Sequence, residues 1–346
     1  IFNKVIKVSG DKSISIRWVL FSSLANGVSK AKNLLISEDV RAAINAINKL
    51  GIKSIIKKNE CKIYGKGLEG YKYKKNITIN AENSGTLGRL ILGLLINTNY
   101  KIKLVGDKSL SKRDFRRIAE PLSKFGAKLT LNNNQNLPMT IIGSPNLKPI
   151  KYLERRGSAQ CKSAVIFGAM RAGNTTIIKA KKSRNHTELI LKNFNYPINI
   201  KKNKKYDLIK IRGLSQFNSF NYNVPGDISS AAFFIALTIL SNDSNLLIKD
   251  VNINPSRTGI IKILKKMNAI IKISNRRTYK GEITGDIYIE SSNNLKSINC
   301  DPKYNSEAID EFLLIFLIAA KANSISKFRN LGELNKKESP RLDLSI

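Results

Sequence analysis

Short polar segments that combine Lys or Arg with small and hydroxylic residues recur along this chain. The first runs Gly10-Asp11-Lys12-Ser13-Ile14-Ser15-Ile16-Arg17. If a helix begins there, Lys12 and Ser13 lie at its N-terminus and Arg17 lies one turn further along. The first turn of a helix has free N–H groups and a partial positive charge, so these side chains can bind a phosphate there. Taken alone, the segment fits a capped helix with solvated cations equally well.

Segments of similar composition precede other apolar stretches, where each can be a plain helix cap. Small residues at such positions also let backbone N–H groups approach an anion. We expect the charged segment 106–113 to be a solvated loop, and His186, the only histidine, to cap a helix. The three cap-like segments are Asn83-Ser84-Gly85-Thr86-Leu87-Gly88-Arg89, Gly157-Ser158-Ala159-Gln160-Cys161-Lys162-Ser163-Ala164 and Val224-Pro225-Gly226-Asp227-Ile228-Ser229.

Two carboxylates stand at the start of the most apolar stretch of the chain. Asp310 and Glu311 directly precede the run that begins at Phe312. At the start of a buried helix, carboxylates either interact with the free N–H groups or act as general acid and base. Opposite charges gather again in the segment Lys336-Lys337-Glu338-Ser339-Pro340-Arg341-Leu342, which in isolation predicts only a solvated turn.

The composition argues against several classes of function. The net charge is +35, but Lys and Arg are spread through every segment, so we do not expect nucleic-acid binding. The charge does suit small substrates that carry several negative charges. Cys61, Cys161 and Cys300 lie far apart and only one histidine is present, so we expect neither disulfides nor a metal site, and no cofactor.

Targeting signals are not evident in the chain. Lys4, Lys7 and Asp11 interrupt any apolar signal sequence, and the longest apolar run, 312–320, is far shorter than the ~20 residues that span a bilayer. We therefore expect a cytoplasmic protein with no membrane partner. The chain begins at Ile1 rather than Met and ends at Ile346 soon after a charged motif, so we interpret both ends as cut.

The elements that would position these segments follow a repeat. Four times, a helix-like stretch ends at a Gly or Asn and is followed by two short strand-like runs, at intervals of roughly 70 residues. Gly and Asn tolerate the left-handed conformation that closes a helix. A more apolar helix candidate lies between successive stops. The stops are Gly51, Gly126, Asn195 and Asn268, and the apolar candidates are 15–24, 86–95, 158–170, 229–240 and 309–320.

The repeat predicts an α/β (α+β) fold in which each unit has one apolar helix buried inside a ring of repeats and one amphipathic helix outside. The N-termini of the apolar helices would then converge on one side and attract anions. A fifth unit would continue with a strand at 324–329 and a second helix that starts near Arg341.

In this order and spacing, the segments resemble those of the EPSP synthases from about Val8 to Leu342. The most diagnostic pieces are Asp11-Lys12-Ser13-x-Ser15-x-Arg17, Asn83-x-Gly85-Thr86, Ser158-Ala159-Gln160, Ile309-Asp310-Glu311-Phe312 and Lys337-Glu338-Ser339-x-Arg341. Ser158-Ala159-Gln160 is similar to the subgroup called class II. Gly85, where that subgroup often has Ala, favours sensitivity to glyphosate.

The resemblance implies a two-domain, inside-out α/β barrel of repeated βαβαββ units, the last units incomplete. One domain would comprise 1–11 with 226–346 and the other 12–225, closing on substrate. The implied reaction transfers the enolpyruvyl group of phosphoenolpyruvate to the 5-hydroxyl of shikimate 3-phosphate, in chorismate and aromatic amino acid biosynthesis. The implied partners are these two substrates, bound by a monomer.

The resemblance also implies roles for the matched residues. Asp310 would accept the proton of the attacking hydroxyl, Glu338 would protonate the methylene carbon, and Lys12 would also take part in catalysis. Two anionic substrates repel each other, so a site rich in Lys and Arg is needed to bring them together. Shikimate 3-phosphate would contact Lys12, Ser13, Arg17, Ser158, Ala159, Gln160, Arg184, Asp310 and Lys337, and phosphoenolpyruvate would contact Lys12, Gly85, Arg113, Gln160 and Arg341.

The chain departs from the family pattern in three places. Asp114 replaces a usual Pro, and Pro340 replaces a usual Asp, which can tilt Arg341 because Pro restricts itself and the residue before it. The family also continues beyond the last matched motif with a His-Arg pair and a Lys that complete the phosphoenolpyruvate pocket. We therefore expect this chain alone to bind shikimate 3-phosphate weakly and to show little or no turnover.

Two alternatives are a related enzyme and a protein of a different class. UDP-N-acetylglucosamine enolpyruvyl transferases have the same repeat fold, but they carry Lys-Asn in place of Lys12-Ser13 and a reactive Cys in the loop that here spans 107–113 and lacks one. A basic nucleic-acid-binding repeat protein would interleave clustered cations with aromatic residues. The aromatic residues of this chain, 7% of the total, lie mainly at apolar periodic positions instead.

Overall fold

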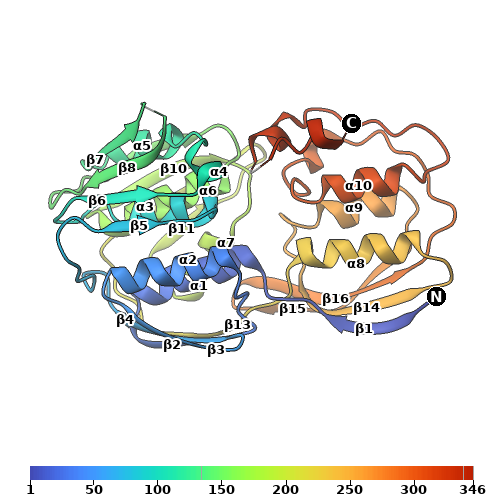
Figure 1. Cartoon of the computed structure of the whole chain (residues 1–346), viewed down its shortest axis with the longest axis horizontal. Coiled ribbons are helices and arrows are strands. Elements are labelled where there is room, and N and C mark those ends of the chain that lie inside the picture. The colour runs from blue at the N-terminus through green and yellow to red at the C-terminus, as the bar shows by residue number, and fades with distance from the viewer. Residues whose placement is uncertain (134, 338, 346) are drawn as a thin grey trace. The chain divides into compact units, whose positions relative to one another are not determined.

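The contacts within the chain divide it into two units, each of which is described by itself (Figure 1). The structure is a computed structural model that describes residues 1–133, 135–337 and 339–345. Unit 1 comprises Ile1–Asp11 and Pro225–Ile346, and unit 2 comprises Lys12–Val224. Among the described residues, no helix is both long and apolar enough to cross a membrane.

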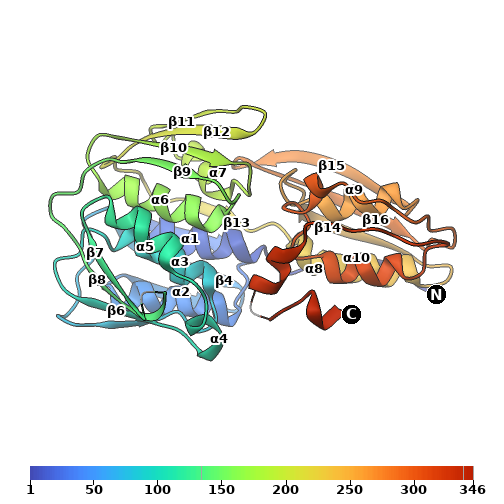
Figure 2. The same cartoon turned by 90° about the horizontal axis from the view of Figure 1, so that it is seen from above.

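Unit 2 contains three four-stranded sheets that have one topology. In each, the first pair of strands is parallel and the two following pairs are antiparallel. The first sheet is β13 (Asn221–Asn223), β2 (Asn26–Lys32), β4 (Glu60–Lys66) and β3 (Lys53–Lys57). The second is β5 (Thr78–Asn80), β6 (Ile102–Val105), β8 (Asn136–Ile142) and β7 (Lys128–Asn132). The third is β9 (Lys151–Glu154), β10 (Thr175–Lys181), β12 (Tyr206–Arg212) and β11 (Ile198–Lys201). In Figure 2, this third sheet covers α6 and α7.

Three apolar helices occupy the centre of unit 2: α1 (Lys12–Leu24), α3 (Gly85–Leu94) and α6 (Ala159–Arg171). They are buried along almost their whole length because each helix carries apolar residues on all of its sides. A Cβ at Gly93 would lie 2.1 Å from the carbonyl oxygen of Ala164, so only glycine allows α3 and α6 to pack this closely. The remaining helices are α2 (Glu38–Lys49), α4 (Lys108–Ser111), α5 (Arg116–Ser123) and α7 (His186–Asn193).

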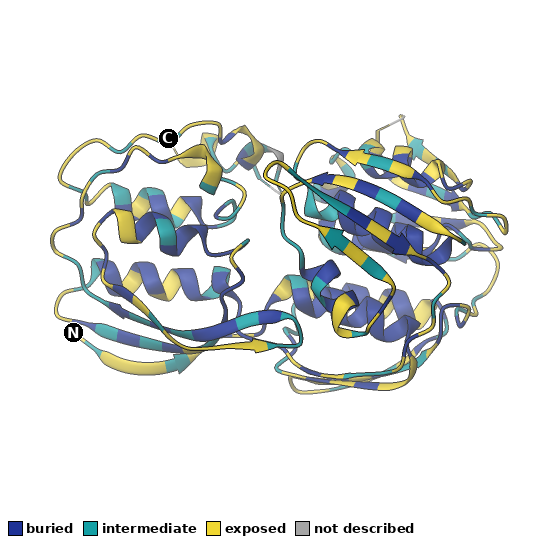
Figure 3. Ribbon diagram, turned by 180° about the vertical axis from the view of Figure 1, so that it is seen from behind, coloured by how far each residue is buried: buried dark blue, intermediate teal, exposed yellow. Residues whose placement is uncertain are grey.

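Unit 1 repeats the same sheet topology once. Its sheet has the order β1 (Asn3–Lys7), β14 (Asn245–Asn252), β16 (Glu282–Glu290) and β15 (Ile271–Tyr279). The apolar helices α8 (Ile228–Leu240) and α10 (Phe312–Ala319) pack against each other, together with α9 (Gly259–Lys266). Figure 3 shows exposed residues along both apolar helices of this unit, whereas the central helices of unit 2 are almost uniformly buried. Three 3₁₀ turns complete the unit: η1 (Pro302–Tyr304), η2 (Gly332–Lys336) and η3 (Asp343–Ser345).

The helix stops expected from the sequence are confirmed. All four lie directly after an amphipathic helix and have positive φ angles, +85° at Gly51, +115° at Gly126, +53° at Asn195 and +69° at Asn268. The expected α/β repeat, with its apolar helices inside unit 2, is confirmed as well.

Three local expectations are wrong. Residues 108–111 form the short helix α4 rather than a loop, because the Asp107 side chain accepts a hydrogen bond from the N–H of Leu110 and caps it. The predicted strand at 324–329 is limited to one bridge, between Lys327 and Asn299. Near Arg341 the chain forms only the 3₁₀ turn at Asp343–Ser345.

Candidate active site

Hydrogen bonds between side chains join the N-terminal turns of the helices in unit 2. The guanidinium of Arg17 donates from Nε to Thr187 Oγ1 at 2.8 Å and from Nη2 to Ser163 Oγ at 3.2 Å. The two hydroxyls lie 2.7 Å apart. Arg17 is therefore buried among α1, α6 and α7, where it aligns the helices.

Lys12 and Ser13 begin α1 next to this network. The side chain of Lys12 is 48% exposed, and its Nζ lies 3.7 Å from a carboxylate oxygen of Asp39. The carbonyl of Ser13 accepts a hydrogen bond from Arg17 Nη1 at 3.0 Å. Lys12 is thus open to solvent at a helix N-terminus, where an anion is favoured.

A second set of contacts joins α3 to α6. Arg89 Nη1 donates to Gln160 Oε1 at 2.9 Å, and Gln160 Nε2 donates in turn to Thr86 Oγ1 at 3.0 Å. Arg89 is only 2% exposed, and its guanidinium lies 5.1 Å from the centre of the Phe115 ring. The amide of Gln160 is therefore held in one orientation at the start of α6.

Three arginines make the start of α3 strongly positive. Burial, together with the nearby charges of Arg117 and Arg113, lowers the pKa of Arg89 to about 9. A Cβ at Gly85 would lie 2.7 Å from Arg89 Nη1 and 2.8 Å from Arg113 Nη1, so both guanidinium groups close over this glycine. Such a cluster of like charges favours binding of an anion.

The predicted residues Ser158, Ala159 and Arg184 lie close to the starts of α6 and α7. Ser158 caps α6 by accepting the N–H of Cys161 at 3.2 Å, and Arg184 precedes α7 in a half-buried turn. Lys162 in α6 and Glu188 in α7 form a more deeply buried ion pair of 2.7 Å, in which their side chains are 2% and 4% exposed.

The predicted residues of unit 1 meet around one carboxylate. Asp310 Oδ1 lies 3.2 Å from Lys337 Nζ and 3.5 Å from Arg341 Nη1. All three side chains are partly exposed, between 17% and 29%. The guanidinium of Arg341 reaches Asp310 with Pro340 in place. Glu338 lies outside the described residues.

Four buried charged residues received no individual role from the sequence. Arg89, Lys162, Glu188 and Arg257 are buried charged side chains, and the first two lie within apolar helices. A charge inside an otherwise apolar helix is the signal that could have identified those two. Among the described residues, no cluster of three or more His, Cys, Asp or Glu could hold a metal ion.

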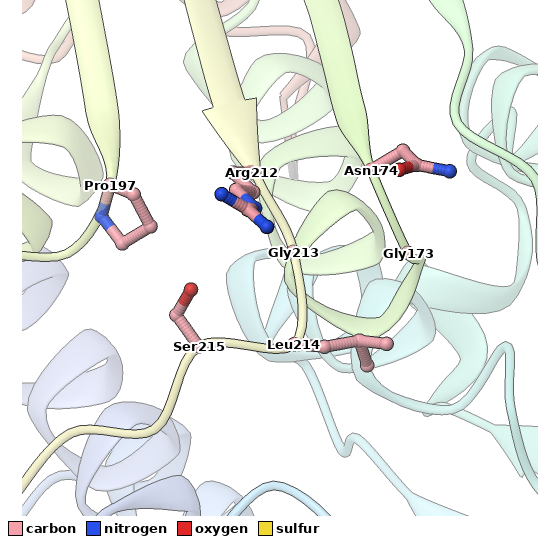
Figure 4. Close-up of a pocket in the computed structure, with 7 residues that line it drawn as sticks. All are labelled: Gly173, Asn174, Pro197, Arg212, Gly213, Leu214 and Ser215. Atoms are coloured by element: carbon pink, nitrogen blue, oxygen red, sulfur yellow. The ribbon is translucent and has the colours of Figure 1, made fainter.

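A separate pocket of about 400 Å³ lies in unit 2, at the ends of β10 and β12 (Figure 4). None of the predicted site residues lines it. Its walls are formed by Gly173, Asn174, Pro197, Arg212, Gly213, Leu214 and Ser215.

Comparison with known proteins supports one family. The sequence model of EPSP synthase (3-phosphoshikimate 1-carboxyvinyltransferase) matches residues 2–346. The 3-phosphoshikimate 1-carboxyvinyltransferase of Petrotoga mobilis is 39% identical over 345 residues, which are 98% of this chain and 78% of the relative. That of Ruthia magnifica is 41% identical over 340 residues, which are 98% of this chain and 77% of the relative.

Solved structures agree with the sequence comparisons. An EPSP synthase of Acinetobacter baumannii superposes with a TM-score of 0.88 at 34% identity, covering 99% of this chain and 77% of that one. The enolpyruvyl transferase NikO of Streptomyces tendae, at 13% identity and a TM-score of 0.68, covers 92% of this chain and 73% of its own and shows the fold alone. With the family model that matches residues 2–346, these findings establish that the chain belongs to the EPSP synthase family, whose members are transferases of a carboxyvinyl group.

Proposed function

We propose that this protein transfers the enolpyruvyl group of phosphoenolpyruvate to the 5-hydroxyl of shikimate 3-phosphate, giving 5-enolpyruvylshikimate 3-phosphate and phosphate. The observation that carries the proposal is the cationic set of linked helix N-termini in unit 2, within a chain of this family. Both proposed substrates carry a phosphate and a carboxylate, and Lys, Arg and helix N-termini bind such groups.

Shikimate 3-phosphate is proposed to bind at the starts of α1, α6 and α7. The exposed ammonium of Lys12 supplies a point charge, and Arg17, whose guanidinium also donates to Thr187 and Ser163, is a second proposed cationic contact. Asp310 and Lys337 of unit 1 are also proposed to contact shikimate 3-phosphate. The other proposed contacts are Ser13, Ser158, Ala159, Gln160 and Arg184.

Phosphoenolpyruvate is proposed to bind at the start of α3. Gly85 leaves space for the guanidinium of Arg113, and Gln160 is oriented there by Arg89. An Arg fork matches a phosphate or carboxylate with two parallel hydrogen bonds. Lys12 and Arg341 are the remaining proposed contacts.

The reaction needs one proton acceptor and one proton donor. We assign the 5-hydroxyl proton to Asp310, while the hydroxyl oxygen bonds to C2 of phosphoenolpyruvate and Glu338 protonates C3. The resulting tetrahedral intermediate loses phosphate from C2 and returns a proton from C3 to the Glu338 carboxylate, which restores the double bond. Lys337 and Arg341 contact the carboxylate of Asp310 and hold it in place, and Lys12 stabilises charge on the reacting groups.

Calorimetry with shikimate 3-phosphate tests the binding half of the proposal on this chain. We expect binding that Lys12→Ala abolishes, because the variant loses the exposed cation at the start of α1. Lys124→Ala, an exposed lysine after α5, is the matched control and should bind as well as the parent protein. Equal affinity in the Lys12→Ala protein would contradict the assignment.

Release of phosphate from phosphoenolpyruvate tests the catalytic half, in the full-length protein that the gene encodes. Release should require shikimate 3-phosphate, and Asp310→Asn should lower turnover by about 10²–10⁴-fold at little cost in stability. Absence of phosphate release from the parent protein would rule out the proposed reaction.

We also propose that the protein acts as a monomer in the cytoplasm and does not bind nucleic acid. Cations spread over every segment and buried free thiols support this proposal. Light scattering would detect a dimer, and DNA binding that persists at moderate salt would contradict the proposal.

A further inference from the structure

A single guanidinium lies among buried acidic side chains in unit 1. Arg257 is 2% exposed; its Nη1 lies 3.2 Å from Asp11 Oδ2 and its Nη2 lies 3.3 Å from Asp227 Oδ1. Nη2 also donates to Ser229 Oγ at 2.8 Å. Burial by itself lowers the pKa of Arg257, but Asp11 and Asp227 raise it above its usual range, so the side chain stays charged.

The contacts of Arg257 continue to the start of α10. The hydroxyl of Ser229 donates to Glu311 Oε1 at 2.5 Å, and Glu311 is 1% exposed. The carbonyl of Glu311 accepts the N–H of Leu314 and so begins α10. Asp310, the proposed base, is the residue immediately before Glu311. The network that begins at Arg257 therefore ends one residue from the proposed base.

The same guanidinium joins the two segments that connect the units. The chain passes into unit 2 after Asp11 and returns at Pro225. The N–H of Asp11 donates to the carbonyl of Pro225 at 2.8 Å, and the N–H of Asp227 donates to that of Ser9 at 2.9 Å. The two segments thus run side by side, and each supplies one of the carboxylates that contact Arg257.

The loop that carries Arg257 is fixed by a further buried acid, Glu282. Glu282 is fully buried and accepts hydrogen bonds from Asn252 Nδ2 at 3.2 Å and from Asn254 Nδ2 at 3.0 Å. The N–H of Arg257 donates to the carbonyl of Asn254 at 2.8 Å. Arg257 is therefore anchored to the sheet of unit 1 through its backbone as well as to the acids through its side chain.

We propose that Arg257 is a positioning residue for the reaction: it holds both connecting segments against the start of α10 and thereby fixes Asp310. The inference rests on the proposed role of Asp310 as the base. A small displacement of a reacting group lowers turnover without a matching loss of substrate binding. Unit 2 supplies most of the proposed contacts to shikimate 3-phosphate. A change at Arg257 should therefore lower the affinity for this substrate less than it lowers turnover.

Two substitutions separate this role from simple stabilisation. Arg257→Lys keeps the charge but loses the fork that spans Asp11 and Asp227. Ser229→Ala removes the hydroxyl that bridges Arg257 Nη2 and Glu311 Oε1, and it leaves the ion pairs of Arg257 with Asp11 and Asp227 in place. Ser230→Ala, one residue along α8 and similarly half-buried, is the matched control.

In the full-length protein, Arg257→Lys and Ser229→Ala should each lower kcat by about tenfold, while the Kd for shikimate 3-phosphate changes by less than about threefold. Ser230→Ala should leave both values unchanged. Parent-like kcat in both test variants would overturn the proposal, as would a loss of binding that parallels the loss of turnover. If Arg257→Lys fails to fold, Ser229→Ala still decides the outcome.

Amide hydrogen exchange tests the connecting segments without any assay of activity. The N–H groups of Asp11 and Asp227 should exchange about tenfold faster in Arg257→Lys than in the parent protein. Unchanged exchange would overturn the role of Arg257 in holding these segments. A parent protein that releases no phosphate would instead contradict the proposed function, and the exchange result would still stand by itself.

Discussion

The two units use the same sheet topology but place opposite charges at their helix N-termini. In unit 2, the starts of the central helices are surrounded by cations, among them Lys12, Arg89 and Arg113. In unit 1, the residues that precede α8 and α10 are the acids Asp227 and Glu311. A repeated scaffold thus presents cations at the helix starts of one unit and carboxylates at those of the other.

The apolar helices of the two units are also buried to different extents. The central helices α1, α3 and α6 of unit 2 contact one another and are enclosed by its sheets. In unit 1, α8 and α10 each expose large apolar side chains that no described residue covers. These are Phe233, Phe234, Leu237, Leu313 and Leu317, of which Phe233 is the most exposed at 65%.

The largest expected effect concerns the buried ion pair of unit 2. Lys162→Met leaves the carboxylate of Glu188 buried without its cation, which should lower the free energy of unfolding by about 3–5 kcal/mol. The control is Lys262→Met in unit 1, where the Lys262–Glu307 pair of 2.6 Å is 39% and 28% exposed. That change should cost about 1 kcal/mol or less. Chemical denaturation measures the free energy of unfolding of both variants. Equal losses would contradict the expected difference between the buried and the exposed ion pair.

A second pair of substitutions compares the apolar helices. Leu90→Ala in α3 removes a fully buried side chain and should cost about 2–5 kcal/mol in unfolding free energy. Leu237→Ala in α8 removes a side chain that is 55% exposed and should cost about 0.5 kcal/mol or less. Denaturation with urea checks both values. A large loss for Leu237→Ala would show that the exposed face of α8 is covered in solution.

A smaller effect is expected at the cationic start of α3. Gly85→Ala places a methyl group against the guanidinium groups of Arg89 and Arg113, whose flexible ends must shift. We expect the affinity for phosphoenolpyruvate to fall about tenfold, or about 1.4 kcal/mol, with little change for shikimate 3-phosphate. Gly332→Ala in unit 1 is the control, because nothing lies within 4 Å of its Cβ position. An equal loss of affinity for both substrates would contradict the assignment of Gly85.

The smallest effect concerns stability at high pH. Burial raises the pKa of Tyr71 to about 12, although Ser23 and Arg171 oppose the shift. Because the folded-state pKa exceeds the unfolded value of about 10, this contribution to stability is complete below pH ~10 and is lost as the pH rises toward 12. Tyr71→Phe should therefore show a shallower loss of stability between pH 10 and 12. If the free energy of unfolding falls with pH at the same slope in both proteins, the result would argue against a buried, protonated phenol at Tyr71.

Much of the fold of unit 2 follows from local features of the sequence. Gly51 and Gly126 end helices because glycine adopts the positive φ angles that the stops require. The apolar helices are recognisable because apolar residues on every side leave no face for water. In unit 1, by contrast, the prediction of a strand at 324–329 is wrong, because residues that favour β-structure do not by themselves provide a partner strand.

The candidate site was predictable as a set of helix starts but not as a set of contacts. Lys12 and Ser158 lie at helix N-termini, as their small and polar neighbours indicate. The sequence did not show that Arg17 donates to Thr187 and Ser163. Periodicity shows which face of a helix is apolar, but it does not show which polar atoms meet once the helices are packed.

By itself, the sequence determined the repeat and the glycine or asparagine stops that follow the four amphipathic helices. These depend on backbone preferences and on apolar periodicity, which act over a few residues. Only the tertiary structure decided that Arg17 meets Thr187, 170 positions away, and that Arg257 meets Asp11, 246 positions away. Such contacts depend on distances of about 3 Å between side-chain atoms, and packing alone sets these distances.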